Sequence, residues 1–442
     1  MDGIALHKNS VQKRELSVSK QRNHSSAKSR VSRRDFLRLA GITITGLLVQ
    51  SCQSQLPAVS PEREPIETAT AQVTTSPVAT QPPHPTAIPT AIQTPTAQAT
   101  PSPVATLSPR PTVTPAAVKT TTAQVAIGQV KTYDRDAIER QLQDLISRLG
   151  GLGDVVKPGD SVAIKTNLTG GIKSGRLPTA GPIESFVTHP EVVRALVKQV
   201  QRAGAKEIFI VEAVYEWESY RQWGYEDIAS DLGVTLIDLN DAKPYQDFVE
   251  APVGANSFVY SSFIFNKILT QVDVFMSVSK MKNHYYAGVT HTMKNLYGLV
   301  PYRFYRLNNQ DTYRTGFHGT EAQTQTRLPR IIVDLNRARP IHFSLIDGIK
   351  TTQGGEGPWI STIKPIEPGV LIAGKNCVAT DAVATAVMGH DPTGNYPDAP
   401  YLRCDNHLNL AAARGLGANR LEKIQVLGVP VDKVKMQFSP AW

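Results

Sequence analysis

The segment between residues 280 and 298 carries the densest group of ionisable side chains in the chain. It follows an apolar run and contains Lys280, Lys282, His284, His291 and Lys294. Lysine ammonium groups bind anions, and histidine exchanges protons near neutral pH because its unperturbed pKa is about 6.5. The residue types predict an enzyme for a small anionic substrate, in which His284 or His291 moves a proton beside Lys294.

The spacing of these residues suggests how they meet. If the segment is helical from about Tyr286, His291 and Asn295 share one face, four residues apart, and Lys294 flanks them. Clustered positive charges depress one another's pKa unless a carboxylate or a bound ligand compensates them. The segment is therefore expected to line a cleft; the alternative is the solvated basic face of a surface helix.

A second polar group is Lys165 with Asn167, which close a predicted strand and lead into a loop with Gly170 and Gly171. With Lys282, Asn295 and Glu356 they are the expected substrate-binding residues. Neither a G-x-x-x-x-G-K-[ST] motif nor a strand-linked G-x-G-x-x-G motif occurs, so no motif supports nucleotide binding. The group is either an anion clamp or a solvated lysine beside a flexible loop.

Three carboxylates are the expected partners of this positive charge: Asp347, Glu356 and Asp381. Glu356 stands among glycines, which let a backbone approach a ligand but also form ordinary tight turns. Asp381 lies among small residues, where a carboxylate is either a hydrogen-bonded structural group or a site member with a shifted pKa.

Apolar runs alternate with helical patterns beyond residue 125. Strands are predicted at residues 125–131, 161–166, 207–211, 234–238, 272–279, 341–346, 369–373 and 423–427. Helices are predicted at 137–149, 225–232, 331–337 and 377–388, with another that opens on a capping box at Thr188 and ends at Gly204. This alternation predicts an α/β fold, in one lobe or two, with a largely parallel or mixed sheet covered by helices and its site beyond the carboxyl ends of the strands.

Several motifs of the predicted domain, residues 125–442, resemble a bacterial and archaeal family of unknown function, DUF362. They are Thr188-His189-Pro190-Glu191, Lys282-x-His284, Met293-Lys294-Asn295-Leu296-Tyr297-Gly298, Gly355-x-Gly357-Pro358 and Ala379-Thr380-Asp381-Ala382-Val383-Ala384. Many members carry a ferredoxin-like module. This domain has only Cys377 and Cys404, whereas a cluster commonly needs four thiolates, so no iron–sulfur cluster is expected.

A narrower resemblance concerns His284 to Lys294. It is similar to the segment of nickel-dependent lactate racemases in which a histidine precedes, by ten residues, the lysine that holds a nickel-pincer nucleotide. Here His291 and Thr292 replace the glycines of that segment. The resemblance implies distant shared architecture and makes this nucleotide, or a metal with unidentified ligands, a candidate cofactor at Lys294.

The first 52 residues read as an export signal. Arg33 and Arg34 precede Phe36 and a short uncharged run that ends at Cys52, which resembles a twin-arginine signal with a lipidation site. The expected partners are the twin-arginine translocase and, through a lipid on Cys52, the extracytoplasmic face of the membrane. The alternative is a plain signal peptide with a chance cysteine.

Residues 53–124 contain 14 Pro, 16 Thr and no Gly, and predict a disordered stalk, because such a composition cannot bury a core. Of the chain's net charge of +9, most falls in residues 1–38, which hold ten Lys/Arg against three Asp/Glu. The domain lacks a basic cluster, so no nucleic-acid partner is expected. Two functions fit: an enzyme for a small anionic substrate, or a non-catalytic, surface-tethered binding protein.

Overall fold

The computed structural model describes residues 122–442 of the 442-residue chain. The predicted signal, with Arg33, Arg34 and Cys52, lies outside the described residues, as does the predicted stalk up to residue 121. Ala123 and Gln124, predicted as the end of the stalk, are instead the first residues of a strand. Within residues 122–442, no helix has both the length and the apolar character needed to span a bilayer.

Residues 122–442 contain one ten-stranded mixed sheet. Its central path runs β12-β1-β11-β9-β7-β2-β3-β4, with β10 paired to β9 and β8 paired to β7. The strands are β1 (Ala123–Gln129), β2 (Ser161–Lys165), β3 (Glu207–Glu212), β4 (Thr235–Asp238), β7 (Val274–His284), β8 (Gly288–Thr290), β9 (Phe343–Gln353), β10 (Lys364–Ile366), β11 (Val370–Gly374) and β12 (Ile424–Gly428). The neighbours from β9 through β7, β2 and β3 to β4 are parallel, whereas β11 is antiparallel to both β1 and β9. A separate hairpin joins β5 (Phe248–Pro252) to β6 (Ser262–Asn266).

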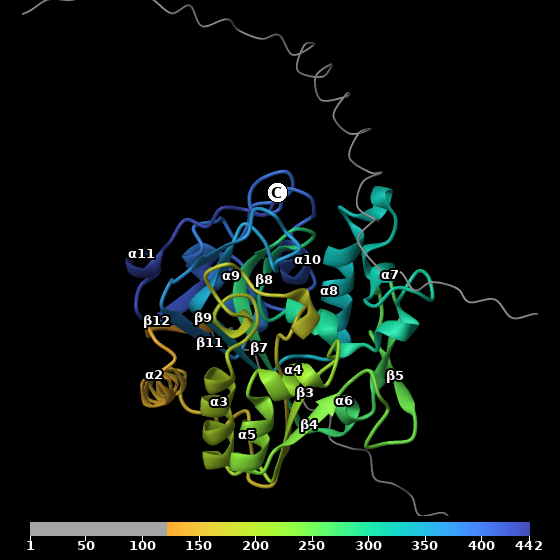
Figure 1. The fold of residues 1–442 in the computed structure, drawn as a ribbon. Coiled ribbons are helices and arrows are strands. Elements are labelled where there is room, and N and C mark those ends of the chain that lie inside the picture. Colours follow the sequence, from red (N-terminus) through yellow and green to blue (C-terminus); the bar gives the residue numbers. More distant parts are fainter. Residues whose placement is uncertain (1–121) are drawn as a thin grey trace, which may run out of the picture. The chain divides into compact units, whose positions relative to one another are not determined.

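Helices cover both faces of the sheet (Figure 1). They are α2 (Arg135–Arg148), α3 (Pro190–Arg202), α4 (Glu218–Gln222), α5 (Tyr225–Leu232), α6 (Ile268–Gln271), α7 (Thr315–His318), α8 (Arg327–Ala338), α9 (Cys377–Val387), α10 (His407–Ala413) and α11 (Val431–Val434). The cores follow the alternation of strand side chains: Leu371 of β11 packs with α2, α3 and α5, whereas Val370 and Ile372 pack with α8 and α9.

The predicted α/β class with a mixed sheet is therefore confirmed, and most predicted elements lie within a few residues of the observed ones. Helix α5 matches its predicted range, residues 225–232. Of the undivided and two-lobed arrangements that the sequence left open, the described residues have the undivided one, because they fall within a single compact unit.

The capping box predicted at Thr188 is wrong. Helix α3 begins at Pro190 and its N-cap is His189, whose Nδ1 accepts a hydrogen bond from the Glu191 amide at 3.2 Å. The Thr188 hydroxyl instead accepts from the Asn167 amide at 3.2 Å and donates to the Val278 carbonyl oxygen at 3.3 Å. Because its hydroxyl is engaged by residues of other elements, Thr188 does not cap the helix.

The helix predicted from about Tyr286 is also wrong. Strand β7 continues to His284, turns, and pairs back through the antiparallel strand β8, and a 3₁₀ helix follows at Lys294–Leu299. Every residue of β7 is buried. Its extension past residue 279 places Lys280, Lys282 and His284 at alternate positions of a buried strand, a pattern that the polar composition concealed.

Candidate functional site

A cavity of about 1070 Å³ opens beside the turn that follows β7. It contains three of the predicted site residues: His284, Lys294 and Glu356. The remaining lining comes from loops and short helices far apart in the sequence and includes Gly170, Tyr215, Tyr285, Tyr286, Tyr297, Tyr313, His318, Trp359, Tyr396 and Arg403.

Lys294 is one of two cations that line this cavity, and the other is Arg403. Lys294 is only 8% exposed, and its Nζ lies 4.3 Å from the centre of the Tyr297 ring. Among residues 122–442 it has no carboxylate within salt-bridge distance and no hydrogen-bond partner. Burial lowers the pKa of Lys294 to about 8, although the charge of Glu356 opposes the shift. Lys294 therefore holds a proton that it can exchange near neutral pH, and it presents a charge that protein atoms do not neutralise.

His284 lies in the same cavity in a fixed tautomer. Its Nδ1 accepts a hydrogen bond from the Tyr286 amide at 3.1 Å, so the proton of the neutral ring is on Nε2. Burial, followed by the charge of Lys294, holds the pKa of His284 well below 6.5. The neutral ring is consequently a hydrogen-bond donor through Nε2–H, and its Nδ1 lone pair is already engaged.

Glu356 is held by two donors rather than by a lysine. One carboxylate oxygen accepts from the Tyr285 amide at 3.0 Å, and the other accepts from the indole Nε1 of Trp359 at 3.1 Å. The carboxylate thereby joins the turn after β7 to the loop that carries Trp359. It counterbalances the positive field of the cavity without closing the anion site at Lys294.

Lys282 was expected to bind substrate, but it does not line the cavity. Its Nζ donates to the carbonyl oxygens of Phe186 and of Glu356, the second at 3.0 Å. Burial lowers the pKa of Lys282 well below its ordinary value. The side chain joins two loops under the cavity floor, so its role is structural.

Lys165, Asn167 and Asn295 form a buried network that likewise lies outside the cavity lining. Lys165 forms an ion pair with Glu212 at 2.8 Å, and burial lowers the pKa of Lys165. The Asn295 Oδ1 accepts from Lys165 at 3.3 Å and from the Asn167 amide group at 3.0 Å. The expected anion clamp is therefore already occupied by a protein carboxylate, and Glu212 was missed in the sequence because it looks like the end of an ordinary strand.

Asp347 is a structural carboxylate. It lies within β9, rather than after a strand as predicted, and forms an ion pair with Lys280 at 2.9 Å, both side chains being inaccessible to solvent. It also accepts from the Tyr133 hydroxyl at 2.9 Å and the His189 amide at 3.1 Å. Every lone pair that faces the interior has a donor, so Asp347 is not available to a ligand.

Asp381 holds the turn that precedes Lys294. Its carboxylate accepts from the amides of Thr292 and Met293, each at 2.9 Å. Burial raises the pKa of Asp381 to about 7, against these hydrogen bonds. Of the two alternatives for Asp381, the hydrogen-bonded structural group fits. By holding the amides of Thr292 and Met293, the carboxylate positions the residue that follows them, Lys294.

His291 does not enter the cavity. The residue is fully buried, its Nε2 lies 3.2 Å from the sulfur of Met388, and burial lowers its pKa to about 3. The Asn295 amide donates to the His291 carbonyl oxygen at 3.0 Å, but the Asn295 side chain faces Lys165 rather than the His291 ring. His291 therefore lies outside the cavity in which its catalytic role was expected.

Sequence reasoning missed His318 and the aromatic lining. His318 lies in the cavity, its Nε2 is 3.3 Å from the Tyr297 hydroxyl, and burial lowers its pKa to about 4. A signal was present: residues 297–318 carry four tyrosines and two phenylalanines. Of these, Tyr297 and Tyr313 line the cavity, whereas Tyr305 and Phe317 belong to the core.

The nickel-pincer nucleotide can be tested against these side chains. Within residues 122–442, no group of three or more His, Cys, Asp or Glu side chains is placed to hold a metal ion. The cavity histidines are His284, tied to the Tyr286 amide, and His318, close to Tyr297. The donor set therefore does not fit a metal centre, and no chemical step is assigned to one.

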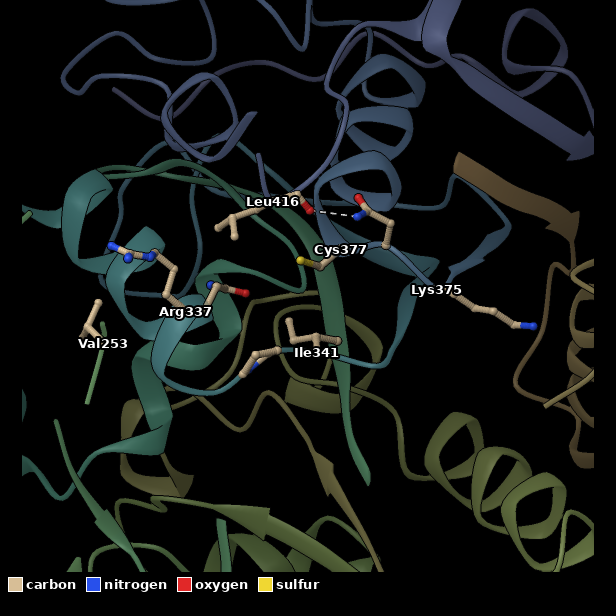
Figure 2. A pocket seen from close by; sticks show the side chains of 9 residues that line it. Val253, Arg337, Ile341, Lys375, Cys377 and Leu416 are labelled. Atoms are coloured by element: carbon tan, nitrogen blue, oxygen red, sulfur yellow. Dashed lines mark hydrogen bonds between the residues drawn. The ribbon is translucent and has the colours of Figure 1, made fainter. Parts of the chain in front are cut away.

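A second, smaller cavity of about 310 Å³ lies between α8 and the start of α9 (Figure 2). Its two cations are engaged elsewhere: Lys375 binds Asp154 at 2.6 Å, and Arg337 donates to carbonyl oxygens of residues 255 and 256. Figure 2 shows the Lys375 amine pointing away from Cys377. This cavity has no free charge to offer a ligand.

These observations define an α/β protein with a helix-covered mixed sheet and one aromatic-lined cavity around a buried lysine. Residues 162–386, about half of the chain, match the family described as a domain of unknown function, DUF362. The chain belongs to this family. It is also 28% identical over 263 residues to a thylakoid-associated protein of Synechocystis sp., a similarity that covers 59% of this chain and 73% of that protein.

Two solved structures are more distantly similar. The lactate racemase apoprotein from Thermoanaerobacterium thermosaccharolyticum is 14% identical with a TM-score of 0.29, over 55% of this chain and 54% of that one. A structural-genomics protein from Thermotoga maritima is 13% identical with a TM-score of 0.31, over 57% of each chain. The chain thus spans just over half the length of either structure.

Proposed function

We propose that the protein is an enzyme that binds a small anionic substrate at Lys294. The observation that carries this proposal is the environment of Lys294: a buried ammonium group, facing a large cavity, with no carboxylate partner among the described residues. An uncompensated buried charge is unfavourable, so an anion that enters the cavity gains the interaction that the protein withholds.

Lys294 and His284 have different chemical roles in this proposal. Lys294, with its pKa lowered to about 8, exchanges a proton near neutral pH. His284 offers Nε2–H as a neutral donor to negative charge that develops on the substrate. The reaction class that fits is proton transfer next to a carboxylate or carbonyl group, with Glu356 holding the turn and loop in place.

A ligand-binding protein without catalysis is the second candidate. One observation favours it: the Nδ1 lone pair of His284 is already used by the Tyr286 amide, so the neutral ring has no free nitrogen with which to accept a proton from a substrate. Hydrogen–deuterium exchange into a bound carboxylic acid at the carbon next to its carboxyl group separates the two. Exchange that Lys294→Met abolishes supports the enzyme, and tight binding without exchange supports the binding protein.

The binding step is tested with a matched pair of lysine variants. Lys294→Met removes the cavity charge, whereas Lys267→Met removes an exposed lysine that lies over the Tyr245 ring at 5.6 Å, outside the cavity. Benzoate and galacturonate serve as probes in calorimetry. Binding that is lost in Lys294→Met and kept in Lys267→Met supports the proposal; equal binding in both variants contradicts it.

Export and tethering are part of the same proposal. Arg33 and Arg34 support translocation by the twin-arginine route, and Cys52 supports a lipid anchor at the extracytoplasmic face of the membrane. Lysine at both arginine positions should retain the chain in the cytoplasm. Cys52→Ala should release the processed chain from the membrane fraction, and retention of that variant would contradict the anchor.

A further inference from the structure

The aromatic side chains at the cavity identify its ligand more closely. Seven of them line the cavity: Tyr215, Tyr285, Tyr286, Tyr297, Tyr313, Trp359 and Tyr396. Four of these side chains are exposed, with exposed fractions of 42% for Tyr215, 44% for Tyr313, 48% for Trp359 and 45% for Tyr396. Exposed aromatic faces gathered around one cavity mark a binding surface, because each gains free energy when a flat ligand covers it.

The Trp359 ring is held in place before any ligand arrives. It lies against the backbones of Gly170 and Gly357, and a Cβ atom added at Gly170 would stand 2.6 Å from the indole. Its Nε1 donates to Glu356 at 3.1 Å. The glycines that the sequence suggested for ligand approach thus bring backbone against an aromatic ring, which reduces the ordering cost of binding.

The charge of the cavity limits the charge of the ligand. Its ionised side chains are two cations, Lys294 and Arg403, and two carboxylates, Glu321 and Glu356. Arg403 lies over the Tyr285 ring at 4.3 Å. Because the two carboxylates balance the two cations, the cavity suits a single carboxylate better than the several charges of a nucleoside diphosphate or triphosphate.

The other polar lining groups are uncharged. The lining includes Thr169, Ser174, Thr315, Thr324 and Gln325, and the tyrosines of the lining carry hydroxyl groups. The volume of about 1070 Å³ is at the upper end of the roughly 300–1,000 Å³ of drug-sized sites. A hydroxyl-rich ligand with several rings fits this lining better than a small acid.

We infer that the ligand is an acidic oligosaccharide, with the carboxylate of one uronic acid unit on Lys294 and neighbouring sugar rings against Trp359 and the exposed tyrosines. This inference rests on the proposed anion site and names its ligand class. Sugar rings have one apolar face that stacks on aromatic side chains and hydroxyl groups that bond to the polar lining.

Calorimetry on the full-length chain tests it with three sets of probes. The first holds uronate oligosaccharides of two to six units, from galacturonate, mannuronate, guluronate and glucuronate polymers. The second holds neutral galactose oligosaccharides of the same lengths. The third holds benzoate and AMP. We expect binding by at least one uronate series that strengthens with length, and affinity at least tenfold weaker for the neutral series.

Two tryptophan variants examine the stacking. Trp359→Ala should weaken uronate binding at least tenfold, and Trp359→Phe, which keeps a ring, should recover most of the loss. Trp217→Ala is the matched control, since Trp217 is 42% exposed but does not line the cavity, and should change affinity less than twofold.

The outcomes separate this inference from the proposed function. If benzoate or AMP binds in a Lys294-dependent manner and no uronate series does, the saccharide is wrong and the anion site stands. If neutral oligosaccharides bind as well as uronates, both the acidic ligand and the anion site are wrong. Equal affinity in Trp359→Ala and wild type would overturn the stacking.

Discussion

Buried lysines occupy two different environments in this protein. In the sheet, Lys280 is 2.9 Å from Asp347 and Lys165 is 2.8 Å from Glu212, and further hydrogen bonds complete both ion pairs. At the cavity wall, Lys294 is buried against Tyr297 and has no such partner among the described residues. Burial of a lysine therefore does not by itself indicate its role. A lysine in a buried ion pair stabilises the fold, whereas a buried ammonium group without a partner indicates a binding site.

The largest effect should follow from breaking a sheet pair. Asp347→Ala leaves Lys280 unpaired in a solvent-free interior and should cost about 3–5 kcal/mol in the free energy of unfolding. Asp432→Ala, which removes an exposed partner of Lys433, should cost less than about 0.5 kcal/mol. Urea denaturation measures both, and a similar small cost for the two variants would remove the distinction between the environments.

Crowding the second pair should be less damaging. A Cβ added at Gly298 would stand 2.9 Å from the Lys165 Nζ and closer still to Glu212, so Gly298→Ala should cost about 1–3 kcal/mol. Gly153 has no atom within 4 Å of an added Cβ and supplies the control. Equal stability of the two alanine variants would show that the Lys165–Glu212 ion pair can move aside at little cost in the free energy of unfolding.

Removing the cavity lysine should hardly affect the fold. Lys294→Met eliminates an uncompensated charge and keeps the apolar stem, so the variant should be at least as stable as wild type at neutral pH. Binding of the carboxylate probes should be lost in the same variant. A cooperative loss of structure in thermal melts would instead place Lys294 with the structural lysines.

The smallest effect is a difference in pH dependence. The pKa of Lys294 is lowered to about 8 in the folded state, so between pH 8 and the unfolded value near 10.5 the unfolded chain binds the extra proton. Wild-type stability should therefore rise with pH in this window relative to Lys294→Met. Anion affinity should fall as pH rises through 8, and parallel stability curves for the two proteins would contradict the shift.

Asp381 adds a pH effect of opposite sign. Its pKa is raised to about 7, so the folded chain holds a proton that the unfolded chain has released between about pH 4 and 7. Its contribution to stability is present below pH 4 and is lost as pH rises to 7. The difference in unfolding free energy between wild type and Asp381→Ala should therefore shrink over that window, and a constant difference in urea titrations would contradict the shift.

Some site residues were visible in the sequence, and others were not. Lys294 and His284 emerged because polar groups crowd the end of an apolar run, and Glu356 emerged because it stands among glycines. Lys282 and His291 emerged for the same reason and proved structural, since composition cannot show which face of a strand a side chain occupies. Trp359 went unremarked because a single aromatic residue in a loop has no periodic pattern.

The sequence by itself determined the order of strands and helices, since apolar periodicity and helix-ending glycines are local properties of the chain. The tertiary structure alone decided which lysine is free. Glu212 and Asp347 lie 47 and 67 residues from the lysines they pair with, and parallel strand pairing in the sheet brings each to its partner. Lys294 does not lie on a strand: the chain turns after His284, pairs back as β8 and leaves the sheet after Thr290, and Lys294 begins the 3₁₀ helix that follows.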